Sequence, residues 1–126
     1  MRILVVDDDP MASEMIAAVL EAAGHAVVLA DNAIAASERL DADGGFALVV
    51  SDLNMPLVSG IEFCEGLRAD GNAIPFILLT GDEPETLASG DAGVDACLVK
   101  DATLDARLPG VVDALVADRA RTGAPR

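Results

Sequence analysis

Four short apolar runs in this sequence end in side chains that could do chemistry. These side chains are the acids Asp7, Asp8 and Asp9, then Asp52, Thr80 and Lys100. Carboxylates brought within about 4 Å of one another repel by several kcal/mol at the effective dielectric of a protein surface, so they bind a cation or take up protons. Oxygen ligands with room for water suit Mg²⁺, and a magnesium site at these strand ends is therefore expected.

The lysine and the threonine add groups that bind the opposite charge. Lys100 is the only lysine in the chain, and its ammonium suits a phosphoryl oxygen or a carboxylate. The hydroxyl of Thr80 and the backbone N–H of Gly81 can donate to an oxyanion. Carboxylates, a divalent metal, a lysine and a hydroxyl together indicate phosphoryl transfer, with a carboxylate as the nucleophile and the metal neutralising the moving charge.

The elements that must position these side chains alternate along the chain. Continuous apolar runs suit strands that are buried on both faces. Helical spacing of apolar residues, with Pro10 at a start and Gly24 at a stop, predicts helices between the strands. We expect strands at 3–6, 26–30, 47–50, 76–79 and 96–99, and helices at 10–23, 33–40, 61–68, 83–89 and about 109–119.

The last helix contains a proline–glycine pair in the middle of its apolar pattern. A proline inside a helix costs about 3 kcal/mol but is tolerated in the first turn. We therefore expect the regular helix to begin at Pro109 and to follow a looser turn. Alternating strands and helices favour a parallel sheet covered on both faces, with ligands beyond the carboxyl ends of the strands.

The composition excludes several kinds of partner. The chain has 126 residues and a formal net charge of −14, from 22 acids against 8 bases. This length fits one domain, and the acidity argues against nucleic acid or an anionic membrane as a direct partner. No apolar run is long enough to cross a bilayer, and the first residues are not a signal peptide. Cys64 and Cys97 form no CxxC pair, so we expect reduced thiols in a cytoplasmic protein.

The single histidine has a plain interpretation. His25 follows Gly24 between an expected helix and an expected strand, and no acid lies at a useful spacing from it. We expect it to be an exposed loop residue rather than a catalytic base.

Four motifs give the sequence a family resemblance from Arg2 to about Arg119. They stand in the order ILVVDDDP, VVSDLNMPLVSG, FILLTG and CLVKD. With them the chain resembles the receiver domain of bacterial two-component response regulators, and it is similar to the single-domain chemotaxis regulator. We accordingly expect a flavodoxin-like doubly wound α/β fold, with five parallel strands in the order 2-1-3-4-5 and helices on both faces.

The resemblance implies a role for each acid at the site. Asp52 would be the phosphoacceptor, which attacks the phosphohistidine of a partner kinase, and it would also lie at the metal. Asp8 would bind Mg²⁺ directly, and Asp7 would hold it largely through water. The backbone carbonyl of Asn54 would complete the protein ligands. Asp9 matches no family role, and we expect it to be a negative charge at a helix N-terminus.

The resemblance also implies how the protein responds to phosphorylation of Asp52. Thr80 would bind the phosphoryl group and move toward it when Asp52 is modified. Lys100 would contact a phosphoryl oxygen and would pair with Asp52 beforehand. The chain would act in phosphorelay signalling and would catalyse only its own phosphorylation and dephosphorylation.

We expect the receiver domain to span 1–121, with a frayed tail at 122–126 and no output domain after it. The expected partners are a sensor histidine kinase or histidine phosphotransfer protein and a downstream protein target. That target would be contacted near the fourth helix, the fifth strand and the fifth helix.

Two residues depart from the family pattern. Asp101 follows Lys100 where the family usually has a proline, often after a cis bond. A cis bond costs about 3 kcal/mol before other residues, so we expect a trans, rearranged loop in which Asp101 could compete for the lysine charge. Cys97 stands where the family often has an aromatic residue, and the chain has no Tyr or Trp, so an aromatic readout at this position is absent.

Two other functions fit part of the sequence. A haloacid-dehalogenase-type phosphatase would use Asp7 as nucleophile and a GDxxxD motif, here Asp91 and Asp95. That motif should follow Lys100 rather than precede it, and the interpretation leaves SDLNMP unexplained. A pseudo-receiver would keep the fold as an interaction module without phosphorylation. The complete set of acids, Thr80 and Lys100 argues against it, whereas Asp101 favours it.

Overall fold

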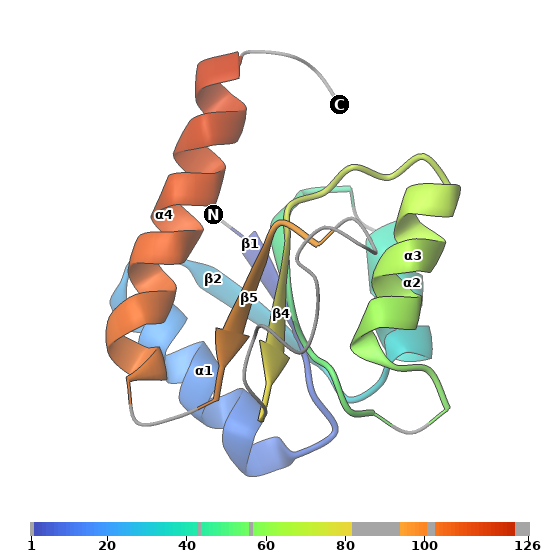
Figure 1. Cartoon of the computed structure of the whole chain (residues 1–126), viewed down its shortest axis with the longest axis horizontal. Helices are drawn as coiled ribbons and strands as arrows, with labels where there is room; N and C mark the ends of the chain where they lie inside the picture. The colour runs from blue at the N-terminus through green and yellow to red at the C-terminus, as the bar shows by residue number, and fades with distance from the viewer. Residues whose placement is uncertain (1, 43, 56, 82–93, 101–102, 123–126) are drawn as a thin grey trace.

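A five-stranded parallel sheet forms the centre of the molecule. The computed structural model describes residues 2–42, 44–55, 57–81, 94–100 and 103–122. The sheet has the strand order β2-β1-β3-β4-β5, which confirms the expected doubly wound order (Figure 1). Its strands are β1 (Arg2–Val6), β2 (Ala26–Ala30), β3 (Phe46–Asp52), β4 (Phe76–Thr80) and β5 (Ala96–Val99).

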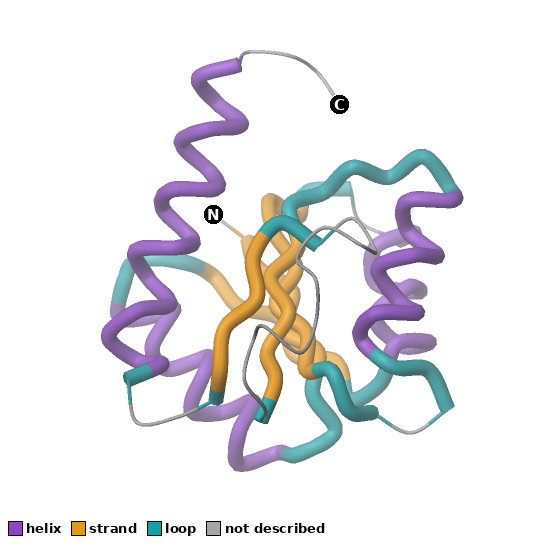
Figure 2. Tube along the Cα trace, in the orientation of Figure 1, coloured by secondary structure: helices purple, strands orange, loops and turns teal. Residues whose placement is uncertain are grey.

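Helices cover both faces of the sheet. On one face lie α1 (Pro10–Ala22) and α4 (Leu104–Thr122), and on the other lie α2 (Ala33–Ala42) and α3 (Gly60–Ala69) (Figures 1 and 2). Alternation along β1 supplies both cores, because Ile3 and Val5 pack toward α1 and α4 while Leu4 and Val6 pack toward α2 and α3. The helix expected at 83–89 lies outside the described residues.

Burial along the strands follows their place in the sheet. Every residue of β4 is buried, and so are the last four residues of β1, as expected for central parallel strands. The edge strand β2 is half exposed. β1, β3 and β4, which lead to Asp7, Asp52 and Thr80, are therefore well packed on both faces.

Side-chain caps fix the starts of the helices α1 and α3, which follow the loops after β1 and β3. The side chain of Asp9 accepts a hydrogen bond from Met11 N, and Pro10 is the first residue of α1, so Asp9 is a helix N-terminal acid as expected. Ser59 and Glu62 form a reciprocal capping box at the start of α3. Each helix thus begins at a defined point a few residues after the strand end.

The last helix begins earlier than the sequence predicts. The expectation of a regular helix from Pro109 is wrong, because α4 runs continuously from Leu104 and holds Pro109 in its interior. Leu104, Leu108 and Val112 share one side of α4 and are almost completely buried against the sheet. Burying such side chains stabilises the fold by about 1.5–3 kcal/mol each, which outweighs the proline cost of about 3 kcal/mol.

The histidine is not exposed, contrary to the sequence expectation. The side chain of His25 is only 8 % exposed, and its Nε2 lies 3.8 Å from Oδ1 of Asp113 on α4. The reason is tertiary, since α4 packs beside α1 over the turn that carries His25. Within the described ranges, no helix is both long enough and apolar enough to cross a bilayer.

Candidate functional site

The carboxyl ends of four strands bring the expected residues to one edge of the sheet. Asp7 directly follows β1, Asp52 ends β3, Thr80 ends β4 and Lys100 directly follows β5. The pairing continues past the last strand, because Lys100 N donates to Thr80 O at 2.8 Å. Backbone hydrogen bonds therefore place Lys100 against the end of β4, facing the acids.

Lys100 bridges two buried carboxylates. Its Nζ lies 3.1 Å from Oδ2 of Asp7 and 3.2 Å from Oδ1 of Asp52. The pairing with Asp52 was expected and the pairing with Asp7 was not. The two acid side chains are only 1 % and 9 % exposed, so neither can rely on water to stabilise its charge.

The three acids differ in how free their oxygens are. Both oxygens of Asp7 have protein partners, since Oδ1 accepts from Asp9 N at 2.9 Å and Oδ2 accepts from Lys100. Asp8, in contrast, is exposed. Asp7 is thus fixed inside the site, while Asp8 stands at its solvent-facing edge.

The donor set fits a divalent cation. Asp7, Asp8 and Asp52 each offer a carboxylate oxygen, and these atoms lie within 4.8 Å of one another. Three carboxylates face a single ammonium, which leaves negative charge uncompensated. An all-oxygen set of this kind suits Mg²⁺ with several bound waters.

Burial and charge shift the protonation of the central pair. Burial raises the pKa of Asp52 above its ordinary value of 3.8, Lys100 opposes this, and the charges of Asp7 and Asp8 add to it. Burial alone would lower the pKa of Lys100. Hydrogen bonds and charges from Asp7 and Asp52 outweigh that effect, so the pKa of Lys100 lies above its ordinary value of 10.5.

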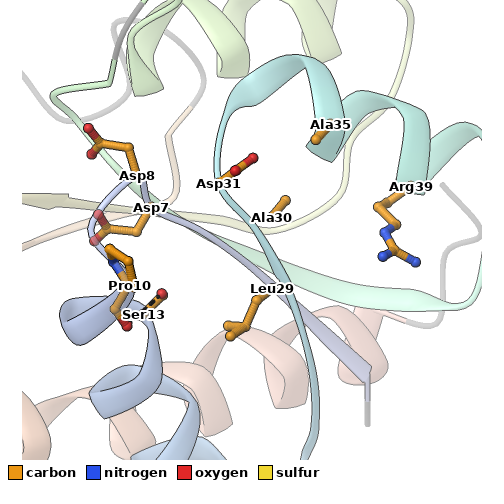
Figure 3. Close-up of a pocket in the computed structure, with 9 residues that line it drawn as sticks. All are labelled: Asp7, Asp8, Pro10, Ser13, Leu29, Ala30, Asp31, Ala35 and Arg39. Atoms are coloured by element: carbon orange, nitrogen blue, oxygen red, sulfur yellow. Dashed lines mark hydrogen bonds between the residues drawn. The ribbon is translucent and has the colours of Figure 1, made fainter.

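A pocket of about 500 Å³ opens beside the acids (Figure 3). Asp7 and Asp8 lie on one side of it and Arg39 of α2 lies on the opposite side. Most of the side chains that line the pocket between them are small or apolar. Its full lining is Asp7, Asp8, Pro10, Ser13, Leu29, Ala30, Asp31, Ala35 and Arg39. The pocket therefore meets the acid site at Asp7 and Asp8, whereas Asp52 does not line it.

The remaining expected residues have different settings. Thr80 is completely buried at the end of β4. Asn54 is exposed in the loop after β3. Asp101 lies outside the described residues. Cys64 is buried and Cys97 is partly buried, and both are free thiols, as expected.

Asp95, the second acid of the motif in the phosphatase alternative, lies at the wrong end of the sheet. Oδ2 of Asp95 accepts from Phe76 N at 2.8 Å and from Arg68 at 3.2 Å. Phe76 begins β4, whereas the acid site lies at the carboxyl ends of the strands. Asp95 therefore joins α3 to the amino ends of β4 and β5, and Asp91 is outside the described residues.

One residue of the site escaped the sequence reasoning. Gly60, the last residue of the VVSDLNMPLVSG motif and the first residue of α3, lies against the backbone carbonyl of Asp52. Its place after the turn that follows Asp52 was visible in the sequence, but the contact depends on how α3 packs on β3.

Comparison with known proteins points to one family. The family described as response regulator receiver domain matches residues 3–110. Response regulator MprA of Mycobacterium avium is 38% identical over 107 residues, which cover 83% of this chain and 46% of the relative. Response regulator MprA of Mycobacterium ulcerans is 39% identical over 106 residues, 82% of this chain and 45% of the relative. The chain thus spans about half the length of these curated relatives.

Solved structures agree with this match. The signal receiver domain of a signal transduction histidine kinase from Syntrophus aciditrophicus is 30% identical with a TM-score of 0.82, and the match covers 93% of this chain and 90% of that one. Response regulator TrrA from Thermotoga maritima, in complex with Mg²⁺-BeF, is 30% identical with a TM-score of 0.78 and coverages of 89% and 96%. A receiver domain from Clostridium thermocellum, 22% identical with a TM-score of 0.86 over 96% and 98% of the two chains, shows the shared fold.

Proposed function

The chain belongs to the response regulator receiver domain family of two-component systems, and on that premise we propose that it accepts a phosphoryl group on Asp52. One observation supports this choice most strongly. Asp7 and Asp52 are both buried and both contact the single lysine, but both oxygens of Asp7 already accept hydrogen bonds, whereas the one hydrogen bond that the described residues give the Asp52 side chain goes to Oδ1. In the proposed step, a carboxylate oxygen of Asp52 attacks phosphorus, the N–P bond of a phosphohistidine breaks, and its electron pair stays on the imidazole nitrogen.

Lys100 and Thr80 would act on the transferred group. Lys100 pairs with Asp52 in the unmodified protein, and we propose that it moves its contact to a phosphoryl oxygen after transfer. The Thr80 hydroxyl would bind a second phosphoryl oxygen. Thr80 is completely buried, so this role requires the end of β4 or its side chain to move toward Asp52.

The acids would hold Mg²⁺. Asp8, exposed at the edge, would bind the ion directly together with Asp52 and the carbonyl of Asn54. Asp7, whose two oxygens already have partners, would act mainly through water. The bound ion would neutralise charge on the phosphoryl oxygens during transfer. The Mg²⁺-BeF complex of the related TrrA supports this proposal.

The phosphodonor would be a protein, a sensor histidine kinase or a histidine phosphotransfer protein. Two large apolar side chains stand exposed on the segments that follow the acids: Met11 is 80 % exposed in the first turn of α1, and Leu57 is 88 % exposed in the loop after Asp52. A protein that binds over this edge of the sheet would cover both side chains, since apolar contacts surrounded by polar groups are common in protein interfaces.

The output would also be a protein contact. We propose that the receiver domain spans 1–121 and signals near β5 and α4, together with the segment before β5 that the structure does not describe. Cys97 replaces an aromatic residue on β5, so this readout would depend on backbone and loop movement rather than on an aromatic side chain.

The pseudo-receiver is the alternative that an experiment must exclude. Acetyl phosphate with Mg²⁺ should give an acid-stable, base-labile aspartyl phosphate on the wild-type chain. No phosphate on the wild type, under conditions that label a control receiver, would favour the pseudo-receiver. The complete set of acids and the Lys100 bridge are the observations that favour a working acceptor.

A further inference from the structure

We propose that Gly60 is a positioning residue for Asp52, and this inference rests on the proposed function of Asp52 as phosphoacceptor. A Cβ placed on Gly60 would lie 2.4 Å from Asp52 O and 3.1 Å from Asp52 C. It would also lie 2.7 Å from Cδ1 of Leu78. Real Cβ atoms do not approach a backbone carbonyl this closely, so any other residue here would force β3 and α3 apart.

The contact fixes the end of β3 against the start of α3. Gly60 N donates to Leu53 O at 2.9 Å, and Leu53 N donates to Leu79 O at 2.7 Å. The hydroxyl of Ser51 donates to Asp52 O at 3.0 Å, so that carbonyl is held from a second side. Because Gly60 has no side chain, the start of α3 can lie directly against the end of β3, which carries the proposed phosphoacceptor Asp52.

A forced separation would act on the chemistry. β3 lies between β1 and β4 in the sheet and cannot shift easily. The displacement would fall on the peptide after Asp52 and on the loop that carries Asn54. That movement would tilt the Asp52 carboxylate away from Lys100 and change the proposed metal ligands. A misplacement of about 1 Å can slow an enzymatic step about 100-fold.

Gly66 provides a matched control in the same helix. A Cβ on Gly66 would meet nothing within 4 Å, and the residue is exposed in the middle of α3. Gly66→Ala should therefore raise the Tm, because alanine favours a helix interior, and should leave phosphorylation at the wild-type rate. The pair of variants adds the same methyl group at two points of one helix.

The first experiment compares Gly60→Ala with Gly66→Ala and the wild type at a temperature where far-UV circular dichroism shows all three folded. Phosphorylation by acetyl phosphate is followed at saturating Mg²⁺, and Mg²⁺ affinity is measured by NMR because the chain has no Tyr or Trp for fluorescence. Gly60→Ala should be phosphorylated at least about tenfold more slowly and should bind Mg²⁺ several-fold more weakly.

A second variant separates positioning from packing. Leu78→Val removes the Leu78 atom that the new methyl group would meet, but the clash with Asp52 O remains. Gly60→Ala with Leu78→Val should therefore regain at most part of the lost Tm relative to Gly60→Ala, without regaining phosphorylation rate or Mg²⁺ affinity. Leu78→Val alone should keep both properties. If Gly60→Ala alone does not fold, the double variant carries the comparison.

The outcomes distinguish this inference from the proposed function. Wild-type phosphorylation rate and Mg²⁺ affinity in a folded Gly60→Ala chain, or their recovery in parallel with Tm in the double variant, would overturn the positioning role. Failure of the wild type and of Gly66→Ala to take up phosphate would instead contradict the proposed function of Asp52.

Discussion

Nζ of Lys100, directly after β5, lies 3.1 Å from Oδ2 of Asp7, directly after β1. This ion pair links the carboxyl ends of two strands that are not neighbours in the sheet. The same ammonium contacts Asp52, which places the only lysine of the chain between two buried acids. Lys100 is therefore part of what stabilises the site before any phosphate or metal arrives, and it can be tested on stability alone.

Replacing Lys100 should destabilise the protein. Lys100→Met leaves Asp7 and Asp52 without their base, and an unpaired buried polar group costs about 1–3 kcal/mol. Because the pKa of Lys100 is raised in the fold, its contribution is present below its ordinary value of 10.5 and is lost as pH rises through the higher folded value. Urea unfolding at pH 7 without divalent ions measures the loss.

Arg107→Met is the matched control, since Arg107 is exposed on α4 and the variant removes the same charge. A loss of stability in Lys100→Met no larger than in Arg107→Met would contradict the bridging role.

The ionised form of Asp52 should destabilise the protein when divalent ions are absent. Burial raises the pKa of Asp52 in the fold, so its favourable contribution is present below the ordinary value of 3.8 and is lost as pH rises through the folded value. Asp52→Asn, which stays neutral, should have a higher Tm than the wild type at pH 7. The difference should vanish near pH 3. Thermal unfolding from pH 3 to 8 in the presence of a chelator checks this, and a lower Tm for Asp52→Asn at pH 7 would show that the shift has the opposite sign.

The conformation of Leu57 should limit stability. Its φ is 72°, a left-handed value that costs a side chain with a Cβ about 1–2 kcal/mol, and its side chain is 88 % exposed. Leu57→Gly should raise the free energy of unfolding by up to about 1 kcal/mol, because the glycine relieves this strain but is more flexible when unfolded. Leu57→Ala keeps the Cβ and should bring no such gain. Equal stability of the two variants in urea would argue against strain at this position.

Asp95 should matter for stability and not for phosphorylation. Asp95→Ala removes the acceptor for Phe76 N and for Arg68 and should cost about 1–3 kcal/mol. Phosphorylation of the folded variant by acetyl phosphate should proceed at the wild-type rate. The phosphatase interpretation requires the contrary, a folded variant with lost phosphoryl chemistry.

The sequence predicted which side chains meet at the carboxyl edge of the sheet better than it predicted their surroundings. Asp52 and Lys100 could be placed together because parallel strands all end at one edge, whatever their exact register. The contact of Lys100 with Asp7 could not be predicted, because β1 and β5 are separated by two strands and only the twist and packing of the whole sheet bring their ends together.

Tertiary packing also decided the two features that the sequence analysis got wrong. The residues around Pro109 predict a helix start at that proline, but burial of Leu104 and Leu108 extends α4 toward the N-terminus. His25 reads locally as an exposed turn residue, but α4 packs over it. The error at His25 arises because a helix that is distant in sequence packs over it. The error at Pro109 arises because burial of apolar side chains outweighs the cost of a proline inside the helix.

The most direct test is to locate the phosphate on the wild-type chain. After reaction with acetyl phosphate and Mg²⁺, borohydride converts an aspartyl phosphate to homoserine, which peptide mass spectrometry can assign to one position. Homoserine at position 52, and none in a folded Asp52→Asn variant, is the result that the proposed function predicts. Homoserine at position 7, or phosphate retained by Asp52→Asn, would contradict it.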